Sequence, residues 1–184
     1  MNLHAIRVAG LTLVVLVVAA CGGGASSAGP TSAPPNTFDE FSTQFCGAFT
    51  SLFRAVGNPD ANTPSVMSKA LDDAVRAGDG PAADRAAAAM LSELEAGRAQ
   101  TAVAARWQPT AATTAQLDRL FLAFEEMTRA KQARAHDPES ADPGNAFEQA
   151  GGRDAWAGVV NGVGSMPVPS GASPTACKAF SGAN

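Results

Sequence analysis

The 184-residue sequence contains no tyrosine, only two histidines and only 16% charged residues. Histidine and tyrosine supply much of the acid–base chemistry and metal ligation found in enzymes, so their scarcity excludes most catalytic and metal sites. The formal net charge of -4 argues against nucleic-acid binding, which normally requires a basic face. We therefore expect a protein that is not an enzyme and has no catalytic residues, no metal, no non-covalent cofactor and no nucleic-acid partner.

Long hydrophobic runs are also scarce. The longest apolar stretch, residues 8–18, is shorter than the roughly twenty residues that a membrane-spanning helix needs. It follows Arg7 and precedes two small residues, Ala19 and Ala20, which is the order found in an export signal peptide. The next residue is Cys21, and the run Val-Ala-Ala-Cys at residues 18–21 resembles the lipobox of bacterial lipoproteins.

This resemblance implies a lipid anchor. In such lipoproteins the cysteine thiol receives a diacylglyceryl group, with palmitate as a typical acyl chain. A peptidase then removes the signal peptide by cutting on the N-terminal side of this cysteine. Residues 1–20 would then be the signal peptide, and Cys21 would hold the mature chain on the outer face of the plasma membrane, in the cell envelope. Two acyl chains give stable attachment, whereas one gives only marginal attachment. The alternative is an ordinary secretory signal cut near Ala20, which leaves a free thiol at Cys21.

Residues 22–36 contain only Gly, Ala, Ser, Thr, Pro and one Asn. A segment without apolar periodicity cannot bury enough surface to offset the entropy of ordering. We therefore interpret residues 21–36 as the lipidated cysteine and a flexible tether, and residues 37–184 as the folded domain. The lipobox, this tether and the high Ala and Gly content are together similar to small lipoproteins of GC-rich actinobacteria such as mycobacteria. That broader similarity is compositional.

Phenylalanines recur at helical spacing from the start of the folded part. They form one stripe at residues Phe38, Phe41, Phe45, Phe49 and Phe53. A stripe of this kind usually belongs to the core of a helical bundle. The alternative is that Phe41, Phe45, Phe49 and Phe53 line a cavity for a small apolar ligand.

Further helices are predicted by caps, apolar periodicity and stop signals. The first is framed by Thr37 and Gly57, and the others are expected from Thr63–Pro64 to Gly78, from Asp79 to about Trp107, from residues 110–114 to Asp137, and at Asp154–Val163. Strand signals are scarce. The consistent fold class is an all-α bundle of four to five helices. A C-terminal strap from Met166 and a final helical turn near residues 174–180 complete the expectation.

The three cysteines divide into one and two. With Cys21 assigned to the anchor, Cys46 and Cys177 form an even pair outside the cytoplasm, where disulfides persist. We expect them to form a disulfide that joins the C-terminal strap to the first helix, and two buried free thiols are the alternative. Because much of the apolar content is alanine, which buries little area, such a constraint should matter for stability.

The remaining distinctive residues are one histidine and two tryptophans. His136 ends the fourth expected helix, where an imidazole interacts favourably with the helix dipole. Trp107 and Trp156 either cap the bundle or mark a surface that binds a partner. We expect a membrane-anchored lipoprotein whose helical domain binds a protein or an envelope lipid, and the alternative is a carrier or sensor of a small apolar ligand that uses helix 38–53.

Overall fold

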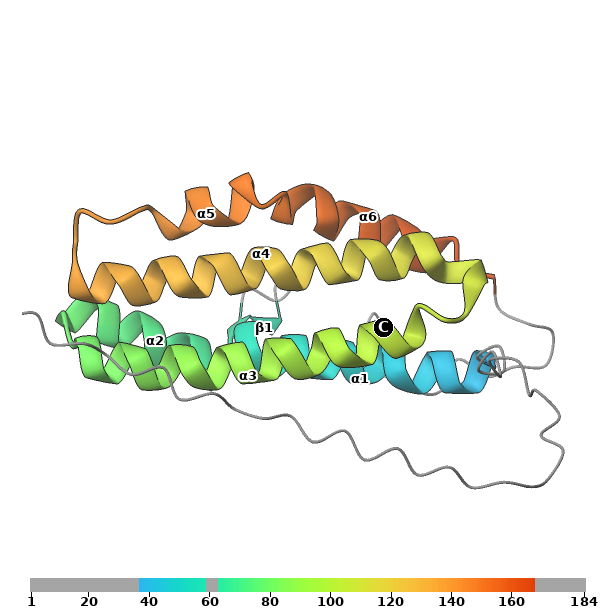
Figure 1. Ribbon diagram of the computed structural model, residues 1–184, viewed down its shortest axis with the longest axis horizontal. Helices are drawn as coiled ribbons and strands as arrows, with labels where there is room; N and C mark the ends of the chain where they lie inside the picture. The colour runs from blue at the N-terminus through green and yellow to red at the C-terminus, as the bar shows by residue number, and fades with distance from the viewer. Residues whose placement is uncertain (1–36, 59–62, 168–184) are drawn as a thin grey trace, which may run out of the picture. The chain divides into compact units, whose positions relative to one another are not determined.

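Two long helices, α3 (Gly80–Ala104) and α4 (Ala111–His136), lie side by side at the centre of the fold (Figure 1). The computed structural model describes residues 37–58 and 63–167 of the chain. A short 3-10 turn, η1 (Gln108–Thr110), joins the two helices and reverses the chain. Pro109 lies in this turn, where its fixed φ angle suits the tight geometry.

Each long helix is flanked by a column of two shorter helices. α1 (Phe38–Val56) and α2 (Val66–Ala77) pack on α3, and α5 (Pro143–Gln149) and α6 (Gly152–Gly164) pack on α4 (Figure 1). α2 also contacts α4. The expectation of a mostly helical fold is confirmed. The expected count of four to five helices is too low, because the described residues form six α-helices.

α1 begins and ends as the sequence predicts. The hydroxyl of Thr37 accepts a hydrogen bond from the backbone N–H of Glu40 at 3.2 Å, which satisfies one of the open donors at the helix start. At the other end, Gly57 has φ +98°, a conformation that residues with a side chain rarely adopt. A Cβ atom placed there would also run into the backbone of Thr63. Glycine is therefore required where α1 stops.

The predicted start of α2 at Thr63–Pro64 is wrong. These two residues form strand β2 (Thr63–Pro64), which pairs antiparallel with β1 (Gly57–Asn58). The N-cap is Ser65, whose hydroxyl accepts from the N–H of Ser68 at 2.9 Å and donates to the carbonyl of Ala55 at 2.6 Å. One serine side chain thus caps α2 and fixes the end of α1 beside it.

α5 has no counterpart among the helices predicted from the sequence. Its N-cap is Asp142, whose carboxylate accepts from the N–H of Asn145 at 3.1 Å. Its seven residues include no fully buried side chain, so no apolar period marks it in the sequence. α5 is held mainly through Phe147, whose ring lies 4.9 Å from that of Phe124 on α4. The helix is thus stabilised by a tertiary contact that local periodicity does not reveal.

The core consists of two clusters that differ in composition. The larger cluster joins α1, α3, α4 and α6 through large side chains that include Phe41, Phe45, Phe49, Leu94, Leu117, Leu120, Phe121 and Val159. The smaller joins α2, α3 and α4 and is rich in alanine: Leu71, Ala74, Ala83, Ala87, Met90 and Ala135. Val56, at the end of α1, packs against both clusters. The α2 end of the bundle therefore buries much less apolar area per residue.

A glycine permits the closest approach at the centre of the bundle. A Cβ atom on Gly97 of α3 would lie 2.4 Å from the ring of Phe121 on α4 and 3.2 Å from the Cβ of Ser51 on α1. Because real atoms do not approach so closely, three helices meet here only in the absence of a side chain. The Phe121 ring thus occupies the volume that a larger residue on α3 would need.

Several predicted features lie outside the described residues. These are the signal peptide 1–20, Cys21, the tether 22–36, the strap beyond Pro167, the helical turn at 174–180, and Cys177. Cys46 lies half-buried in the middle of α1. Within the described ranges, every helix is too short or too polar to cross a bilayer.

Candidate functional site

The middle of α4 presents three apolar side chains on one face. Leu120, Phe124 and Met127 are separated by four and three residues, so they project from the same side of the helix. Leu120 is fully buried, whereas Phe124 and Met127 are only half-buried. Both half-buried residues line open pockets on either side of α4.

The first pocket, here the α5–α6 pocket, lies between α4 and the two helices after it. It has a volume of about 380 Å³, and its apolar lining includes Leu120, Phe124, Met127, Phe147 and Trp156. A Cβ on Gly152 would lie 2.3 Å from the ring of Phe147, so glycine lets that ring fold against α6. The result is an apolar recess walled by aromatic rings.

The α5–α6 pocket exists because the helical column is broken there. Gly151 has φ +75° and separates α5 from α6. The break is bridged by an ion pair, in which Arg153 donates to Glu148 from Nε at 3.1 Å and from Nη2 at 2.7 Å. Hydrogen bonding to Glu148 raises the pKa of Arg153 above its ordinary value. Both residues line the pocket and are the charged members of its lining.

The second pocket, here the hairpin pocket, lies on the other side of the same two residues. It has a volume of about 260 Å³ and is lined by Phe124 and Met127 together with residues from the end of α1, the two short strands and the start of α2: Val56, Gly57, Asn58, Thr63, Pro64 and Ser68. Both flanking columns are therefore interrupted at one level of α4. We call the two adjoining pockets together the cross-groove.

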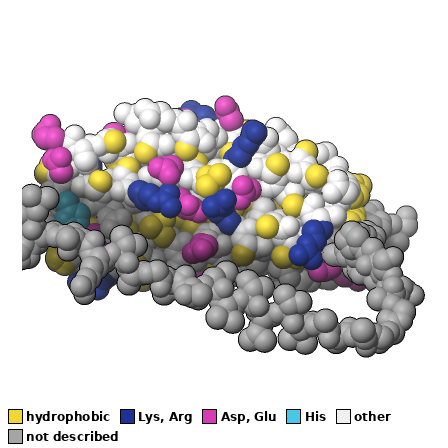
Figure 2. All heavy atoms as spheres, in the orientation of Figure 1, with side chains coloured by type: hydrophobic (Ala, Val, Ile, Leu, Met, Phe, Trp, Pro, Cys, Tyr) yellow, Lys and Arg dark blue, Asp and Glu magenta, His cyan; other side chains and the backbone are white. Residues whose placement is uncertain are grey.

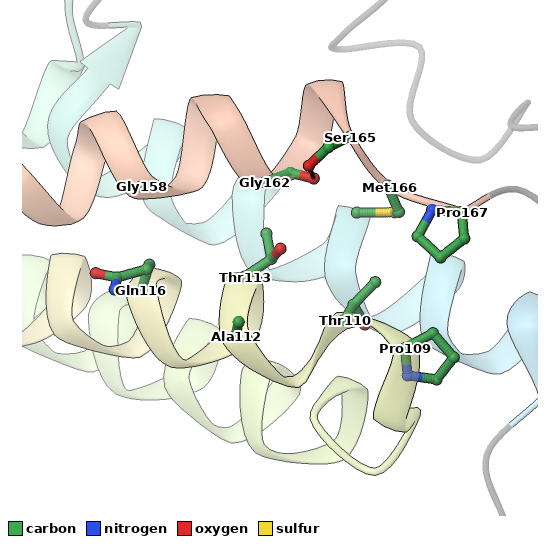
Figure 3. Close-up of a pocket in the computed structure, with 10 residues that line it drawn as sticks. All are labelled: Pro109, Thr110, Ala112, Thr113, Gln116, Gly158, Gly162, Ser165, Met166 and Pro167. Atoms are coloured by element: carbon green, nitrogen blue, oxygen red, sulfur yellow. Dashed lines mark hydrogen bonds between the residues drawn. The ribbon is translucent and has the colours of Figure 1, made fainter.

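A third pocket lies near the start of α4 (Figure 3). Its volume is about 350 Å³, and Thr110, Thr113 and Gln116 face α6 across it. α6 comes close because Gly158 and Gly162 lack side chains: a Cβ on Gly162 would lie 2.3 Å from the hydroxyl of Thr113. The lining mixes neutral polar side chains with apolar ones such as Pro109 and Met166, and it lacks the charged or aromatic groups that would select a particular ligand.

A charged network covers the contact between α3 and α4. Glu125 is nearly buried and pairs with Arg98 at 3.4 Å and with Arg129 at 3.2 Å, and Arg98 also pairs with Asp118 at 2.9 Å. Figure 2 shows acidic and basic side chains intermixed on the face in view, with hydrophobic ones between them. These charges satisfy one another, so they join two helices and do not form a field of one sign.

His136 takes part in a similar contact at the end of α4. Its Nε2 lies 2.9 Å from Asp84 on α3, and its ring packs against Gly80. Hydrogen bonds from Gln132, the larger cause, and from His136 hold the pKa of Asp84 below its ordinary value. A carboxylate whose pKa is lowered by folding stabilises the folded state fully at pH values above the pKa of the unfolded chain. This contribution to stability is lost as the pH falls through the pKa of the folded state. The geometry is that of a helix-joining contact.

The phenylalanine stripe lies mainly in the core. Phe41, Phe45 and Phe49 have exposed fractions of 1–2%, whereas Phe53 is half-buried. None of these four residues lines the α5–α6 pocket, the hairpin pocket or the third pocket near the start of α4. The structure thus places the open apolar space at residues that the sequence analysis did not assign to a ligand site, apart from naming Trp156.

The two tryptophans have different surroundings. Both are half-buried and pack against the larger core cluster. Trp107 lies 4.8 Å from the ring of Phe41 and 5.2 Å from that of Phe38, at the end of the bundle. Trp156 lines the α5–α6 pocket. Trp107 therefore closes one end of the core, and Trp156 contributes to the cross-groove.

Comparison with known proteins adds no assignment. No protein family, curated protein or solved structure matches the chain. In the part of the chain that the structure describes, no three His, Cys, Asp or Glu side chains come together as a metal site would require. The cross-groove is the arrangement whose lining is best suited to binding.

Proposed function

We propose that the protein is a cell-envelope lipoprotein, anchored through a diacylglyceryl group on Cys21, whose helical domain binds a small apolar ligand in the cross-groove. The anchor is supported by the lipobox-like residues 18–21 and by the tether composition of residues 22–36. The first described helix begins at Phe38, just after this tether. Lipid attachment and ligand binding would thus belong to separate parts of the chain.

The observation that carries the ligand proposal is the α5–α6 pocket. Its volume of about 380 Å³ lies in the range of small-molecule sites, about 300–1,000 Å³, and its walls are mainly apolar and aromatic. Ligand sites typically add a few polar groups that fix orientation, and here Glu148 and Arg153 supply them. The pocket therefore has both the size and the lining expected of a ligand site.

The geometry favours a small ligand over a protein partner. A protein interface usually needs a contiguous exposed apolar patch. Within the described residues the exposed large hydrophobic side chains are Val66, Leu122 and Val160, which lie on α2, α4 and α6. Such scattered residues are ordinary for a soluble surface. Binding of a protein partner stays a prediction from the sequence, as does a ligand along helix 38–53.

A disulfide between Cys46 and Cys177 is part of the same proposal. Met166, near the end of the described chain, packs against the larger cluster that contains Phe45, the neighbour of Cys46 on α1. The ten residues from Pro167 to Cys177 can extend over about 35 Å, far enough to return to α1. The position of the chain end therefore supports the pairing.

Replacement of Cys21 should remove the lipid anchor. In bacteria that produce the full chain and are fed an alkyne-labelled palmitate, the wild-type protein should take up the label and fractionate with membranes. Cys21→Ala should take up no label, since no thiol remains at this position to be acylated. Cys46→Ala serves as the matched cysteine control and should stay labelled. Persistent labelling of Cys21→Ala would contradict the anchor.

A charge placed between the two pockets should weaken ligand binding strongly. Met127 is shared by both pockets, and Met127→Glu puts a carboxylate between them. Fluorescence titration with N-phenylnaphthylamine should show at least about tenfold weaker binding, because an apolar ligand would then have to desolvate a charge. Met67→Glu makes the same change at a half-buried methionine on α2 that lines neither pocket, and should bind like wild type. Equal binding by both variants would refute the groove as the site.

A further inference from the structure

We infer that the ligand of the cross-groove is an anionic amphiphile with a single alkyl chain, such as an alkanoate. Its tail would cross α4 from the α5–α6 pocket to the hairpin pocket, with its head group at Arg153. This inference rests on the proposed function, because it names the ligand class of the same site. The shape of the groove and the position of its charges carry the two parts of the inference separately.

The shape favours an extended chain over a compact ligand. The two pockets, of about 380 and 260 Å³, share Phe124 and Met127 in their linings and extend from them toward different helices on the two sides of α4. A ring system of moderate size would occupy one pocket and leave the other unused. An unbranched chain can pass over Phe124 and Met127 and bury its methylenes in both pockets.

The second pocket offers a suitable end for such a chain. Its apolar lining at the α1–α2 connection comes from Val56 and Pro64, and its polar members, Asn58, Thr63 and Ser68, are all neutral. A charged head group would find no opposite charge among these residues. The apolar end of the ligand therefore belongs in the hairpin pocket.

The charges lie at the other end of the groove. Among the lining residues of the two pockets, only Glu148 and Arg153 are charged, and both belong to the α5–α6 pocket. The Arg153 side chain is 79% exposed, so an incoming anion can reach its guanidinium from solvent. Glu148 presents to Arg153 the same carboxylate chemistry as an alkanoate would. Glu148 is thus a competitor of the head group, and its removal should strengthen binding.

Chain length provides the first test. Calorimetric titration of the full chain carrying Cys21→Ser with alkanoates from octanoate to palmitate should show about three- to fourfold tighter binding for each added methylene, equivalent to about 0.8 kcal/mol, until the groove is full. Ser68→Leu fills part of the hairpin pocket. It should make this gain stop at a shorter chain and leave octanoate binding unchanged.

Ser42→Leu is the matched control, because Ser42 is a buried serine on α1 that lines neither pocket. It should show the wild-type length dependence. Affinity that does not depend on chain length, or identical behaviour of the two leucine variants, would overturn the extended-chain assignment.

Vesicles of phosphatidylglycerol form a second arm of the experiment. If the protein extracts the two-chain lipid from these vesicles, the ligand is a bilayer lipid and the single-chain assignment is wrong.

The head group provides the second test. Arg153→Gln should weaken dodecanoate binding about fivefold while leaving dodecanol, which has the same tail and no charge, unchanged. Glu148→Gln should strengthen dodecanoate binding and again leave dodecanol unchanged. Arg134→Gln, which removes another arginine paired with an acidic residue, Asp142, but outside the groove, should change neither ligand. Equal effects on both ligands would overturn the role of Arg153.

The two proposals fail in different ways. If N-phenylnaphthylamine binds and Met127→Glu weakens its binding at least about tenfold, but alkanoates show no length dependence, the cross-groove is a ligand site and only the inferred ligand class is wrong. If neither the dye nor any alkanoate binds the wild-type chain, both proposals are wrong.

Discussion

Phe45→Ala should destabilise the domain by about 3–5 kcal/mol, as truncation of a fully buried phenylalanine does in other cores. Phe45 is 2% exposed, and its ring lies 5.1 Å from Phe41 and 5.2 Å from Phe49. Its removal would leave a cavity in the larger cluster, which holds α1, α3, α4 and α6 together. Chemical denaturation followed by circular dichroism would measure the loss.

Truncation of a second phenylalanine distinguishes the role of the core in stability from the role of the pocket in ligand binding. Phe147→Ala removes a half-buried ring that lines the α5–α6 pocket, and should cost less stability while weakening apolar ligand binding. If Phe45→Ala unfolds the chain completely, Phe45→Leu gives the same comparison with a smaller loss, of about 1–2 kcal/mol. A Phe45 variant that keeps wild-type stability but loses ligand would instead place the ligand on helix 38–53.

Cys46→Ser should lower the melting temperature by roughly ten degrees or more. A disulfide from Cys46 to Cys177 would close a loop of about 130 residues, which constrains the unfolded chain by nominally about 5 kcal/mol in the entropy model. The alanine-rich cluster at the α2 end leaves a modest apolar core, so the domain depends on such a constraint more than a larger core would. Scanning calorimetry under oxidising conditions would measure the shift.

A mutant cycle identifies the partner of Cys46. Cys177→Ser should cause the same shift, and the double variant should lose no more than either single variant, because all three remove one bond. A reducing agent should lower the wild-type melting temperature to the level of the variants and leave the variants unchanged. An unaltered melting curve for Cys46→Ser would rule out the stabilising role.

The elements predicted from the sequence are those with strong local signals. α1 has a cap at Thr37, five phenylalanines at helical spacing and a glycine stop, and each of these acts within a few residues. The predicted start of α2 is wrong because Thr63–Pro64 has the form of a helix start, whereas its backbone pairs with Gly57–Asn58. The true cap, Ser65, is selected by its bond to Ala55, a contact that crosses the chain reversal.

The cross-groove could not be predicted in this way. It forms because two breaks, one before α2 and one between α5 and α6, lie at the same level of α4, although they are far apart in the sequence. Periodicity reports the apolar face of Phe124 and Met127 but not which helices cover it. Phe147 belongs to a helix without a buried residue, so its part in the site depends wholly on the tertiary contact with Phe124.

The most direct measurement is photo-crosslinking of the wild-type lipoprotein in its own membrane. Bacteria that produce the full chain would be fed a fatty acid carrying a diazirine and an alkyne, irradiated, and analysed by peptide mass spectrometry. We expect crosslinks in the peptides that contain Phe124–Met127 and Phe147–Trp156, in addition to acylation of Cys21. Crosslinks confined to Phe41–Phe49, or label on the Cys21 peptide alone, would contradict the cross-groove as the ligand site.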